Sequence, residues 1–499
     1  MLCYKAFHDK SMSLLKRASL ALLLGILVGA CSFQKSLITG SKTAYGYSWQ
    51  QELQIGREAD PAITAEYGLY DDEELARYVS EVGQRVLEES HMRRPDTPPE
   101  YRIDFTFRVL DSPILNAFAL PGGYVYVTRG LLAHMENEAQ LAMVLGHEIG
   151  HVAARHSSQQ AFKSQVGQLG LIGGAVVGEV LAGAGAELLQ VGSAATQLLL
   201  MSYSRGHEHE SDELGVEYSA KSGYQAGEGA GFFVTLKRMS DKAGARIPSW
   251  QSTHPDPGDR ELRILDLANQ WSDSLDMTDV GRDPLFAAID GIVVGANPRQ
   301  GFVKNNVFLH PDLAFRFPVP SGWELYNLTT KVAMTDPQQQ SVVILTLASG
   351  ASPEDAASEF VTQSQVNVRE HRARTINGLD AYYVDASFMQ EQQSLRLVAY
   401  FIAHGDLIYQ FISYTDAGRF NQMSRGLKHA PEGFAVLRDR QVLGIQPNRL
   451  QVRAAPRSAS LRNFITSIPE PFTDEDVAIL NQLQLTSRVD RGYKLKLIQ

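Results

Sequence analysis

The chain has 499 residues, of which 44% are hydrophobic, and this is enough apolar material for a sizeable core and two or three domains. Its formal net charge is −10 and its pI is about 5.8. Because no basic block or stripe is visible in the sequence, nucleic acid is excluded as an expected partner.

The N-terminal segment has the layout of a bacterial lipoprotein signal. Two basic residues precede an apolar run, and Val-Gly-Ala stands directly before Cys31, as in a lipobox. We therefore predict that residues 1–30 are a signal peptide and that Cys31 carries the lipid, with a plain signal peptide or a short membrane anchor as the alternative. Ser32 follows in place of aspartate, which favours a periplasmic protein on the outer membrane of a Gram-negative bacterium. With Cys3 removed and Cys31 modified, no disulfide is expected.

Helices and a small sheet are expected in the first half of the chain. Residues 48–68 and 71–90 carry apolar side chains at helical spacing. Residues 102–112 alternate as a strand, and residues 116–132 have the pattern of two strands joined by a Pro-Gly-Gly turn. These patterns predict a mostly helical domain with a small sheet over residues 46–280.

The stretch MVLGHEIGHVAARH, residues 143–156, combines histidines and a glutamate at metal-site spacing. His147 and His151 are four apart, so on a helix they share one face. Glu148 is placed to take a proton from a water held by this pair, which is what the H-E-x-x-H pattern requires. His156 falls about half a turn away on a continuous helix and is excluded as a ligand. The alternative is a core helix that matches by accident.

A third ligand is available in YSRGHEHESDELG, residues 203–215. Glu208 and Asp212 are four apart and again share one helical face. Glu208 can complete a His, His, Glu site, while Asp212 can accept the free ring N–H of His147. A solvated, charged helix face is the alternative interpretation. Three neighbours rank lower as ligands: His207, His209 and Glu210.

A loop-like stretch with two prolines and a glycine, THPDPGDR at residues 253–260, contains a further histidine. His254 on such a loop can swing onto a metal and take its fourth position, which would displace the catalytic water. Arg260 would then hold the far end of the loop through a carboxylate or a carbonyl. The alternative is that His254 only caps or packs the loop.

These motifs resemble the gluzincin metalloendopeptidases of the HtpX and CAAX-protease type, the forty-eighth metallopeptidase family. That family carries H-E-x-x-H and then E-x-x-x-D on a later helix, usually after a Ser-Arg pair, as Ser204 and Arg205 stand here. The strand pair at 116–132 matches as well, and THPDPGDR is similar to a segment of periplasmic BepA- and LoiP-like members. The similarity covers roughly residues 46–275. Ser211 is a departure, because many relatives have alanine there.

The resemblance implies one Zn²⁺ per chain and hydrolysis of peptide bonds. The site residues that it implies are His147, His151 and Glu208 as metal ligands, Glu148 and Asp212 as catalytic residues, and His254 as a regulatory fourth ligand. The implied substrates are unfolded or misassembled polypeptides in outer-membrane protein quality control, with the outer-membrane assembly machinery as a partner. An envelope chaperone or scaffold lipoprotein with little proteolysis is the alternative function.

The stretch LGLIGGAVVGEVLAGAGAELL, residues 169–189, is long enough to cross a membrane. Glu179 interrupts it and glycine is frequent, so we predict a helical hairpin near the active-site cleft. A segment that dips into the membrane is the alternative.

The second half of the chain is expected to hold an α+β domain with an antiparallel sheet at residues 300–445, after a connector at 283–303. Short alternating runs predict the strands, with one hairpin turning at 404–406, and helices are expected at 353–370 and 415–437. No catalytic constellation is visible there, so binding of a substrate or partner, or positioning of the peptidase, is the expected role.

Residues 447–499 weakly resemble a LysM module in their order of strand, helix, helix and strand. The usual opening Gly-Asp-Thr is missing, because Arg457-Ser458-Ala459 stands there. A degenerate structural copy therefore competes with a module that binds peptidoglycan. The expected fold class is α+β throughout: a zincin-type peptidase domain, an antiparallel-sheet domain and a small LysM-like module.

Overall fold

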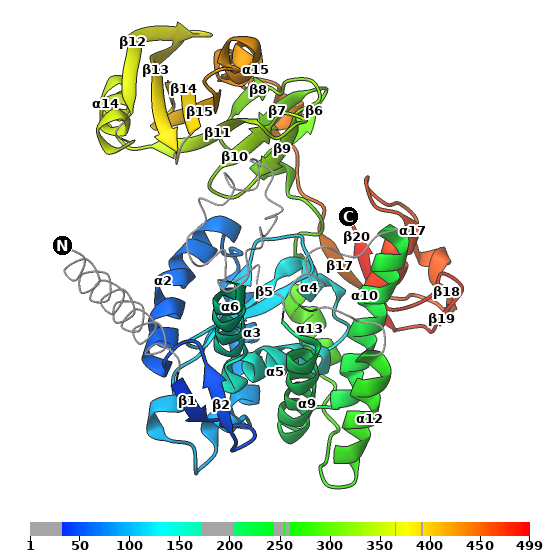
Figure 1. Ribbon diagram of the computed structural model, residues 1–499. Helices are drawn as coiled ribbons and strands as arrows, with labels where there is room; N and C mark the ends of the chain where they lie inside the picture. The colour runs from blue at the N-terminus through cyan, green and yellow to red at the C-terminus, as the bar shows by residue number, and fades with distance from the viewer. Residues whose placement is uncertain (1–31, 172–202, 244–253, 255–259, 365, 391–392) are drawn as a thin grey trace, which may run out of the picture.

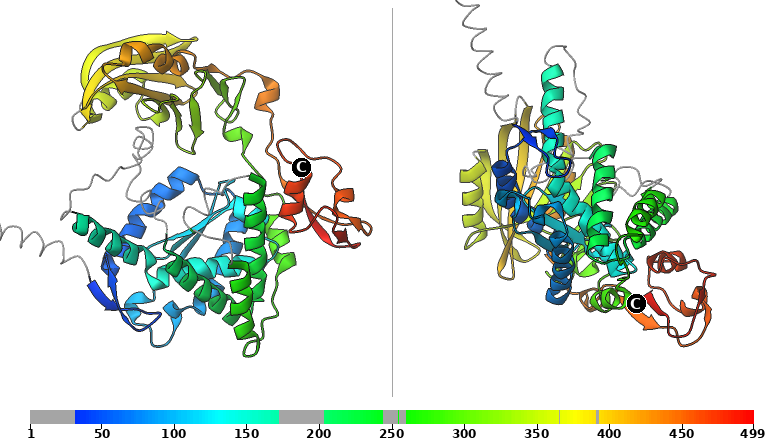
Figure 2. Two further views of the ribbon diagram at one scale, coloured as in Figure 1. Left: turned by 45° about the vertical axis from the view of Figure 1, so that its right-hand side comes forward. Right: turned by 90° about the horizontal axis from the view of Figure 1, so that it is seen from below.

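The computed structural model describes residues 32–171, 203–243, 254, 260–364, 366–390 and 393–499. They form a helical body built round a small sheet, a sheet-rich body on one side of it and a small C-terminal module on another (Figure 1, Figure 2). The architecture is mixed α and β, as predicted. The predicted signal peptide, Cys31 and most of the stretch at 169–189 lie outside the described residues. In the part of the chain that is described, no helix is both long enough and apolar enough to span a bilayer.

The helical body contains the helices expected from apolar spacing, here α2 and α3. Its elements up to residue 171 are β1 (Ser32–Lys35), β2 (Lys42–Tyr45), α2 (Trp49–Tyr67), α3 (Glu73–Glu88), β3 (Thr106–Leu110), β4 (Ala117–Leu120), β5 (Tyr124–Thr128), α4 (Arg129–His134), α5 (Glu138–Ala154) and α6 (His156–Leu171). From residue 203 onward it contains α9 (Arg205–Lys221), α10 (Gly229–Ala243), α12 (Arg260–Ser272) and α13 (Arg282–Ile289).

The three-stranded sheet of this body has β5 in the middle and β3 and β4 at its edges. Its order is β3-β5-β4, with β3 parallel and β4 antiparallel to β5. The predicted Pro-Gly-Gly turn joins β4 to β5. Gly122 and Gly123 have φ angles of 85° and 88° there, a region that glycine enters without steric penalty. Strand β4 is the edge strand beside which α5 packs.

Two glycines allow α5 and α9 to cross closely. A Cβ atom on Gly215 would lie 2.9 Å from the backbone nitrogen of His147, and one on Gly146 would lie 3.0 Å from the carbonyl oxygen of Gly215. Because neither glycine has a side chain, the two backbones approach until Glu208 and Asp212 of α9 meet the histidines of α5.

Helix α5 ends before the third histidine of its motif. Arg155 lies in the left-handed region, with φ 60° and ψ 42°, and His156 begins a new helix, α6. The assumption of one continuous helix over residues 143–156 is therefore wrong. The Arg155 guanidinium stabilises the break, because it donates to Glu52 Oε1 over 2.8 Å and to the Tyr47 carbonyl over 2.9 Å.

The segment predicted as a connector is partly a core helix. Helix α13 occupies its first part, and Leu285, Phe286 and Ile289 are buried in the main core of the helical body. The expectation of a plain connector at 283–303 is wrong for these residues. A helix of 8 residues shows too little periodicity in the sequence to be told from a loop.

The sheet-rich body consists of two antiparallel sheets with a helix on each face of the larger one. Its elements are β6 (Phe302–Lys304), β7 (Val307–His310), β8 (Phe315–Pro318), β9 (Glu324–Asn327), β10 (Val332–Thr335), β11 (Ser341–Ala348), α14 (Pro353–Ser364), β12 (Asn367–Ile376), β13 (Leu379–Gln390), β14 (Gln393–His404), β15 (Leu407–Asp416), α15 (Phe420–Glu432), β16 (Ala435–Val436) and α16 (Arg440–Leu443). The seven-stranded sheet has the order β12-β13-β14-β15-β11-β10-β9, and the four-stranded sheet has the order β16-β8-β7-β6. Separate apolar cores lie under α15 and under α14.

Local predictions for this body were right where turn chemistry guided them. His404 pairs with Leu407, so Gly405 and Asp406 form the turn of the expected hairpin. The helix expected at 353–370 is too long, because α14 ends at Ser364 and β12 follows. Strand β12 is a charged, exposed edge strand without apolar alternation, so the sequence pattern did not reveal it.

The C-terminal module folds back onto the helical body. It contains β17 (Leu450–Ala454), β18 (Ala459–Ser460), a 3₁₀ turn (Leu461–Phe464), α17 (Asp474–Leu480), β19 (Arg488–Val489) and β20 (Lys494–Ile498). Four of its apolar residues belong to the main core: Leu450, Val477, Leu480 and Ile498. The order of elements follows the expectation, but a LysM-like identity is not confirmed. Backbone hydrogen bonds also join residues 291–294 to residues 448–450, so the chain enters and leaves the sheet-rich body at neighbouring points.

We expect Gln482→Ala to destabilise the helical body. Gln482 and the buried Gln140 of α5 exchange two side-chain hydrogen bonds of 3.0 Å. Removing one partner leaves a buried amide unsatisfied, which costs about 1–3 kcal/mol of unfolding free energy. Urea unfolding followed by circular dichroism measures this loss. The exposed Gln484→Ala serves as the control and should change the value by less than about 0.5 kcal/mol. Equal free energies for the two variants would contradict the contact.

Candidate metal centre

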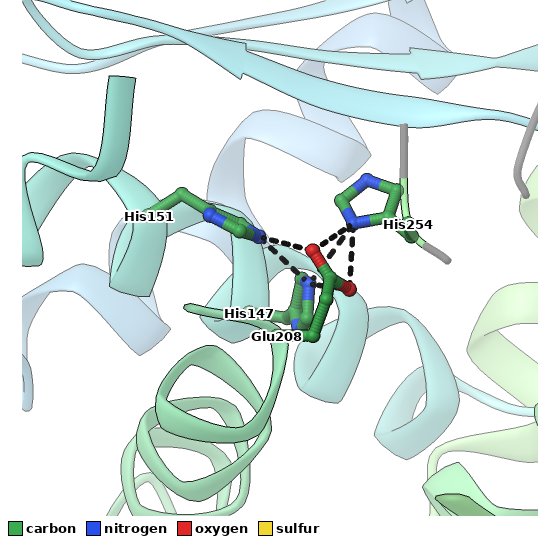
Figure 3. Close-up of side chains that lie close together, drawn as sticks. All are labelled: His147, His151, Glu208 and His254. Atoms are coloured by element: carbon green, nitrogen blue, oxygen red, sulfur yellow. Dashed lines mark hydrogen bonds and ion pairs between the residues drawn. The ribbon is translucent and has the colours of Figure 1, made fainter. Parts of the chain in front are cut away.

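Four side chains converge on one point inside the helical body. His147 and His151 come from α5, Glu208 comes from α9, and His254 comes from the stretch before α12 (Figure 3). Each offers one ligand atom, and these atoms all lie within 4.8 Å of one another. All four residues are buried, so the group is shielded from bulk water.

The separations between these atoms approximate the edges of a tetrahedron. His147 Nε2 lies 3.0 Å from His151 Nε2 and 3.3 Å from His254 Nδ1. The Glu208 oxygens lie 3.7 Å from His147 Nε2, 3.6 Å from His151 Nε2 and 3.1 Å from His254 Nδ1. A tetrahedral ion with bonds of about 2.0–2.1 Å requires edges of about 3.3 Å. The residues present therefore fit a single metal ion.

Asp212 and Arg260 set the orientation of His147. His147 Nδ1 lies 3.0 Å from Asp212 Oδ1, and because the carboxylate accepts, Nδ1 is the donor and Nε2 keeps the lone pair. Arg260 donates to both Asp212 oxygens, over 2.5 and 3.0 Å, and its Nη1 lies 3.3 Å from Glu208. Burial alone would raise the pKa of Asp212, but Arg260 and His147 hold it well below its usual range. The carboxylate partner expected for Arg260 is thus Asp212.

His156 and Glu210 orient His151 in a similar way. Glu210 Oε2 accepts from His156 Nε2 over 3.0 Å, which leaves His156 Nδ1 as an acceptor. His151 Nδ1 lies 3.0 Å from that atom and donates to it, so its Nε2 lone pair faces the other ligands. Neither role was predicted from the sequence. The break at Arg155 brings His156 into this position, and no glycine or asparagine marks that break.

Glu148 lies beside the group without a hydrogen-bond partner among the described residues. It is fully buried, and neither of its carboxylate oxygens is satisfied there. His254 Nε2 lies 3.5 Å from Glu148 Oε1. Burial raises the pKa of Glu148, which suits a group that accepts a proton and later releases it. An unsatisfied buried carboxylate needs a polar partner, and a water between it and a metal meets that need.

The electrostatics of His151 and Glu208 favour their metal-binding forms. Burial lowers the pKa of His151 well below its ordinary value, and the neighbouring His147 adds to this effect. Burial alone would raise the pKa of Glu208, but His254 and His147 outweigh it, so the pKa is lowered. A neutral imidazole and an ionised carboxylate are the forms that bind metals.

The other residues considered as ligands lie away from the centre. His207 stacks on His156 with ring centroids 4.4 Å apart, and His209 is exposed. Tyr203, which no sequence pattern singled out, stacks on His151 with centroids 4.0 Å apart. Its ring covers one side of that ligand.

The edge strand β4 borders the centre. His254 Nε2 lies 3.4 Å from the carbonyl oxygen of Ala117, the first residue of β4. His254 therefore contacts both the ligand group and the backbone edge that an extended chain would pair with.

Comparison with known proteins agrees with this geometry. The model of peptidase family M48 matches residues 73–268, which include all four residues of the group together with Glu148 and Asp212. Residues 73–268 are a domain of peptidase family M48.

Relatives with similarity to this chain carry protease names. The chain is 29% identical over 237 residues to the beta-barrel assembly-enhancing protease of Escherichia coli, which covers 46% of each chain. It is 29% identical over 227 residues to the putative beta-barrel assembly-enhancing protease of Vibrio cholerae, covering 44% of this chain and 45% of that one. Over 182 residues it is 31% identical to the mitochondrial metalloendopeptidase OMA1 of Bos taurus, covering 35% and 34% of the two chains. The chain thus spans less than half the length of these relatives.

Proposed function

We propose that the protein is a zinc-dependent metalloendopeptidase of the bacterial cell envelope that cleaves unfolded or misassembled polypeptides. The observation that carries the proposal is the convergence of His147, His151 and Glu208 beside an unsatisfied Glu148. Two imidazoles and one carboxylate at tetrahedral spacing form a donor set of catalytic zinc. The match to peptidase family M48 supports the peptide bond as the bond that is cleaved.

The chain's own residues supply orientation and proton transfer. When bound, zinc supplies Lewis acidity and lowers the pKa of a water molecule. Asp212 holds His147, and the pair His156 and Glu210 holds His151, so both Nε2 lone pairs point inward. Glu148 takes a proton from the attacking water. Because burial raises its pKa, the acid form persists until the leaving amine accepts the proton.

Strand β4 is the proposed platform for the substrate. It is an edge strand of its sheet and lies against the ligand group, since His254 contacts Ala117. An extended polypeptide that pairs with this edge brings a backbone carbonyl to the centre. Folded proteins cannot offer a free strand, so unfolded chains are the preferred class.

Metal analysis combined with a cleavage assay tests the proposal. The purified protein should contain one zinc per chain and cleave unfolded casein. A chelator should abolish cleavage, and added zinc should restore it. Failure to cleave any unfolded polypeptide at full zinc occupancy would overturn the proposal. The alternative of a scaffold without proteolysis has no support in the comparisons, whose relatives are named as proteases.

His254 is the proposed regulatory fourth ligand. Its Nδ1 lies 3.1 Å from Glu208 and 3.3 Å from His147 Nε2, where the attacking water would have to stand. Its Nε2 lies near Ala117, so it also blocks the strand edge. In this arrangement the centre is at rest, and movement of His254 away from the group would open the water position and the substrate edge together.

We expect His254→Ala to retain zinc and to cleave unfolded casein several-fold faster than the parent protein. Removing the imidazole frees the fourth position without touching the other three ligands. The measurement is turnover per bound zinc, with metal content determined on the same sample. Unchanged or lower turnover at full occupancy would contradict the resting-state role.

The proposed location is the periplasmic face of the outer membrane, with a lipid on Cys31. The names of the assembly-enhancing relatives support outer-membrane protein quality control as the setting and the assembly machinery as the partner.

We expect Cys31→Ser to release the protein from membranes or to stall its processing, which fractionation and mass spectrometry would detect. Continued tight association of the variant would favour the stretch at 169–189 as the anchor. Binding of the C-terminal module to peptidoglycan remains a separate proposal, tested by pulldown with sacculi.

A further inference from the structure

The hairpin formed by β1 and β2 presents an apolar and cationic face to solvent. Phe33, Lys35 and Lys42 are exposed on it, and Phe33 exposes 71% of its surface, the most of any large hydrophobic residue described. Lys35 lies opposite Lys42, and Phe33 lies opposite Ala44. No acidic residue occurs at positions 32–51.

The other face of this hairpin is fixed to the end of the metal-binding helix. Gln34 Oε1 accepts a hydrogen bond from Arg155 over 2.5 Å, and the ring of Tyr45 lies 3.9 Å from the guanidinium carbon of Arg155. Because Arg155 directly follows the helix that carries His151, its contacts connect the hairpin to the metal centre.

The position proposed for lipid attachment lies next to the exposed face. Consecutive Cα atoms are about 3.8 Å apart, so the Cα atoms of Cys31 and Phe33 are within about 8 Å of each other. No flexible linker separates Cys31 from β1, because the strand begins at the next residue. Acyl chains on Cys31 therefore enter the bilayer beside Phe33.

We propose that the outer face of the β1–β2 hairpin rests on the anionic surface of the lipid bilayer, with Phe33 among the headgroups and Lys35 and Lys42 against the phosphates. The proposal rests on the lipid attachment that is part of the proposed function. An aromatic side chain flanked by lysines is the composition of segments that lie in a membrane interface. These three side chains need only orient a protein whose acyl chains already hold it there.

This contact would set the height of the metal centre above the membrane. The path from Cys31 through Gln34 and Arg155 to His151 is short. The metal centre therefore lies no more than roughly 40 Å from the lipid-bearing residue. The sheet-rich body lies on the far side of the helical body from the hairpin (Figure 1, Figure 2). Polypeptides stalled close to the membrane surface are therefore the class of substrate that this orientation favours.

Site-directed spin labelling tests the contact. Processing removes Cys3 and lipidation occupies Cys31, so Phe33→Cys introduces a single free thiol. The lipidated protein carrying a nitroxide at position 33 is reconstituted into vesicles of phosphatidylethanolamine and phosphatidylglycerol. Accessibility to oxygen and to a water-soluble nickel chelate is then measured. Met389→Cys, 63% exposed on the seven-stranded sheet, provides the matched control.

We expect the label at position 33 to be open to oxygen and shielded from nickel, and the label at 389 to behave as in water. Adding Lys35→Glu and Lys42→Glu should reduce the inserted population at position 33 by more than about twentyfold. Water-like behaviour at both labels would overturn the proposal. Shielding of the label at position 33 from both reagents would also overturn it, because a protein partner rather than the bilayer would then cover this face. Absence of acyl chains on Cys31 by mass spectrometry would remove the basis of the contact but leave the peptidase proposal standing, because cleavage is assayed in solution.

Discussion

Replacing Glu148 by glutamine should lower kcat by about a hundred- to ten-thousand-fold while the protein keeps its zinc. Glutamine preserves the shape of the side chain but cannot accept a proton from the attacking water. Glu148 is not among the four convergent ligands, and its oxygens have no other hydrogen-bond partner in the described structure. The measurement is kcat on unfolded casein together with zinc content.

The control for this variant is Glu81→Gln, on the exposed side of α3, where Glu81 forms a surface ion pair with Arg77. It should leave kcat within about twofold, because a surface ion pair contributes little. If Glu148→Gln cleaved as fast as Glu81→Gln at equal zinc content, proton transfer would have to be assigned to another residue.

Replacing Glu208 by alanine should weaken zinc binding by more than about a hundredfold. Mutating a residue that only orients a metal ligand typically lowers the affinity ten- to hundredfold, and loss of a ligand itself should cost more. Competition with a chromogenic chelator measures the affinity. The structure provides a graded series on α9. Glu210→Ala removes the partner of His156 and should fall in the intermediate range, while the exposed Glu213→Ala should bind zinc normally.

The order of the three affinities decides the assignment. Full zinc occupancy in Glu208→Ala would move the ligand role to another residue of the same helix, with His207, His209 and Glu210 as the candidates. A larger loss in Glu210→Ala than in Glu208→Ala would show that orientation of His151 matters more than the carboxylate ligand itself.

The parts of the centre that follow helical periodicity could be predicted from the sequence. His147 and His151, and likewise Glu208 and Asp212, are pairs four residues apart, and the structure brings these pairs together. The pairing of Arg260 with a carboxylate was expected because Arg260 carries a positive charge and lies at the end of a loop-like stretch with acidic neighbours. One turn of helix fixes the spacing within each of the two pairs. The contact of Arg260 with Asp212 joins two helices, and the sequence indicated only that Arg260 would meet a carboxylate or a carbonyl.

The contacts that depend on a break in a helix could not be predicted, because no residue in the sequence signals the break. Arg155 adopts a left-handed conformation that glycine or asparagine usually signals, so His156 was placed on the wrong side of a helix that does not continue. The contact between Gln140 and Gln482 spans 342 positions, and no local pattern reports such a separation. Helix α13 was missed because it is short and lies between glycines.

The C-terminal module packs into the core of the helical body although it is synthesised after the sheet-rich body. Ile498 and Leu480 belong to the same apolar core as α5, yet they are made after the whole sheet-rich body. Synthesis proceeds from the N-terminus. A nascent chain therefore already contains every residue of the metal centre before the core residues of the C-terminal module have been made. The core closes only after residue 498 has been made. We therefore expect the metal centre to be fully packed only after the C-terminal module has joined the core.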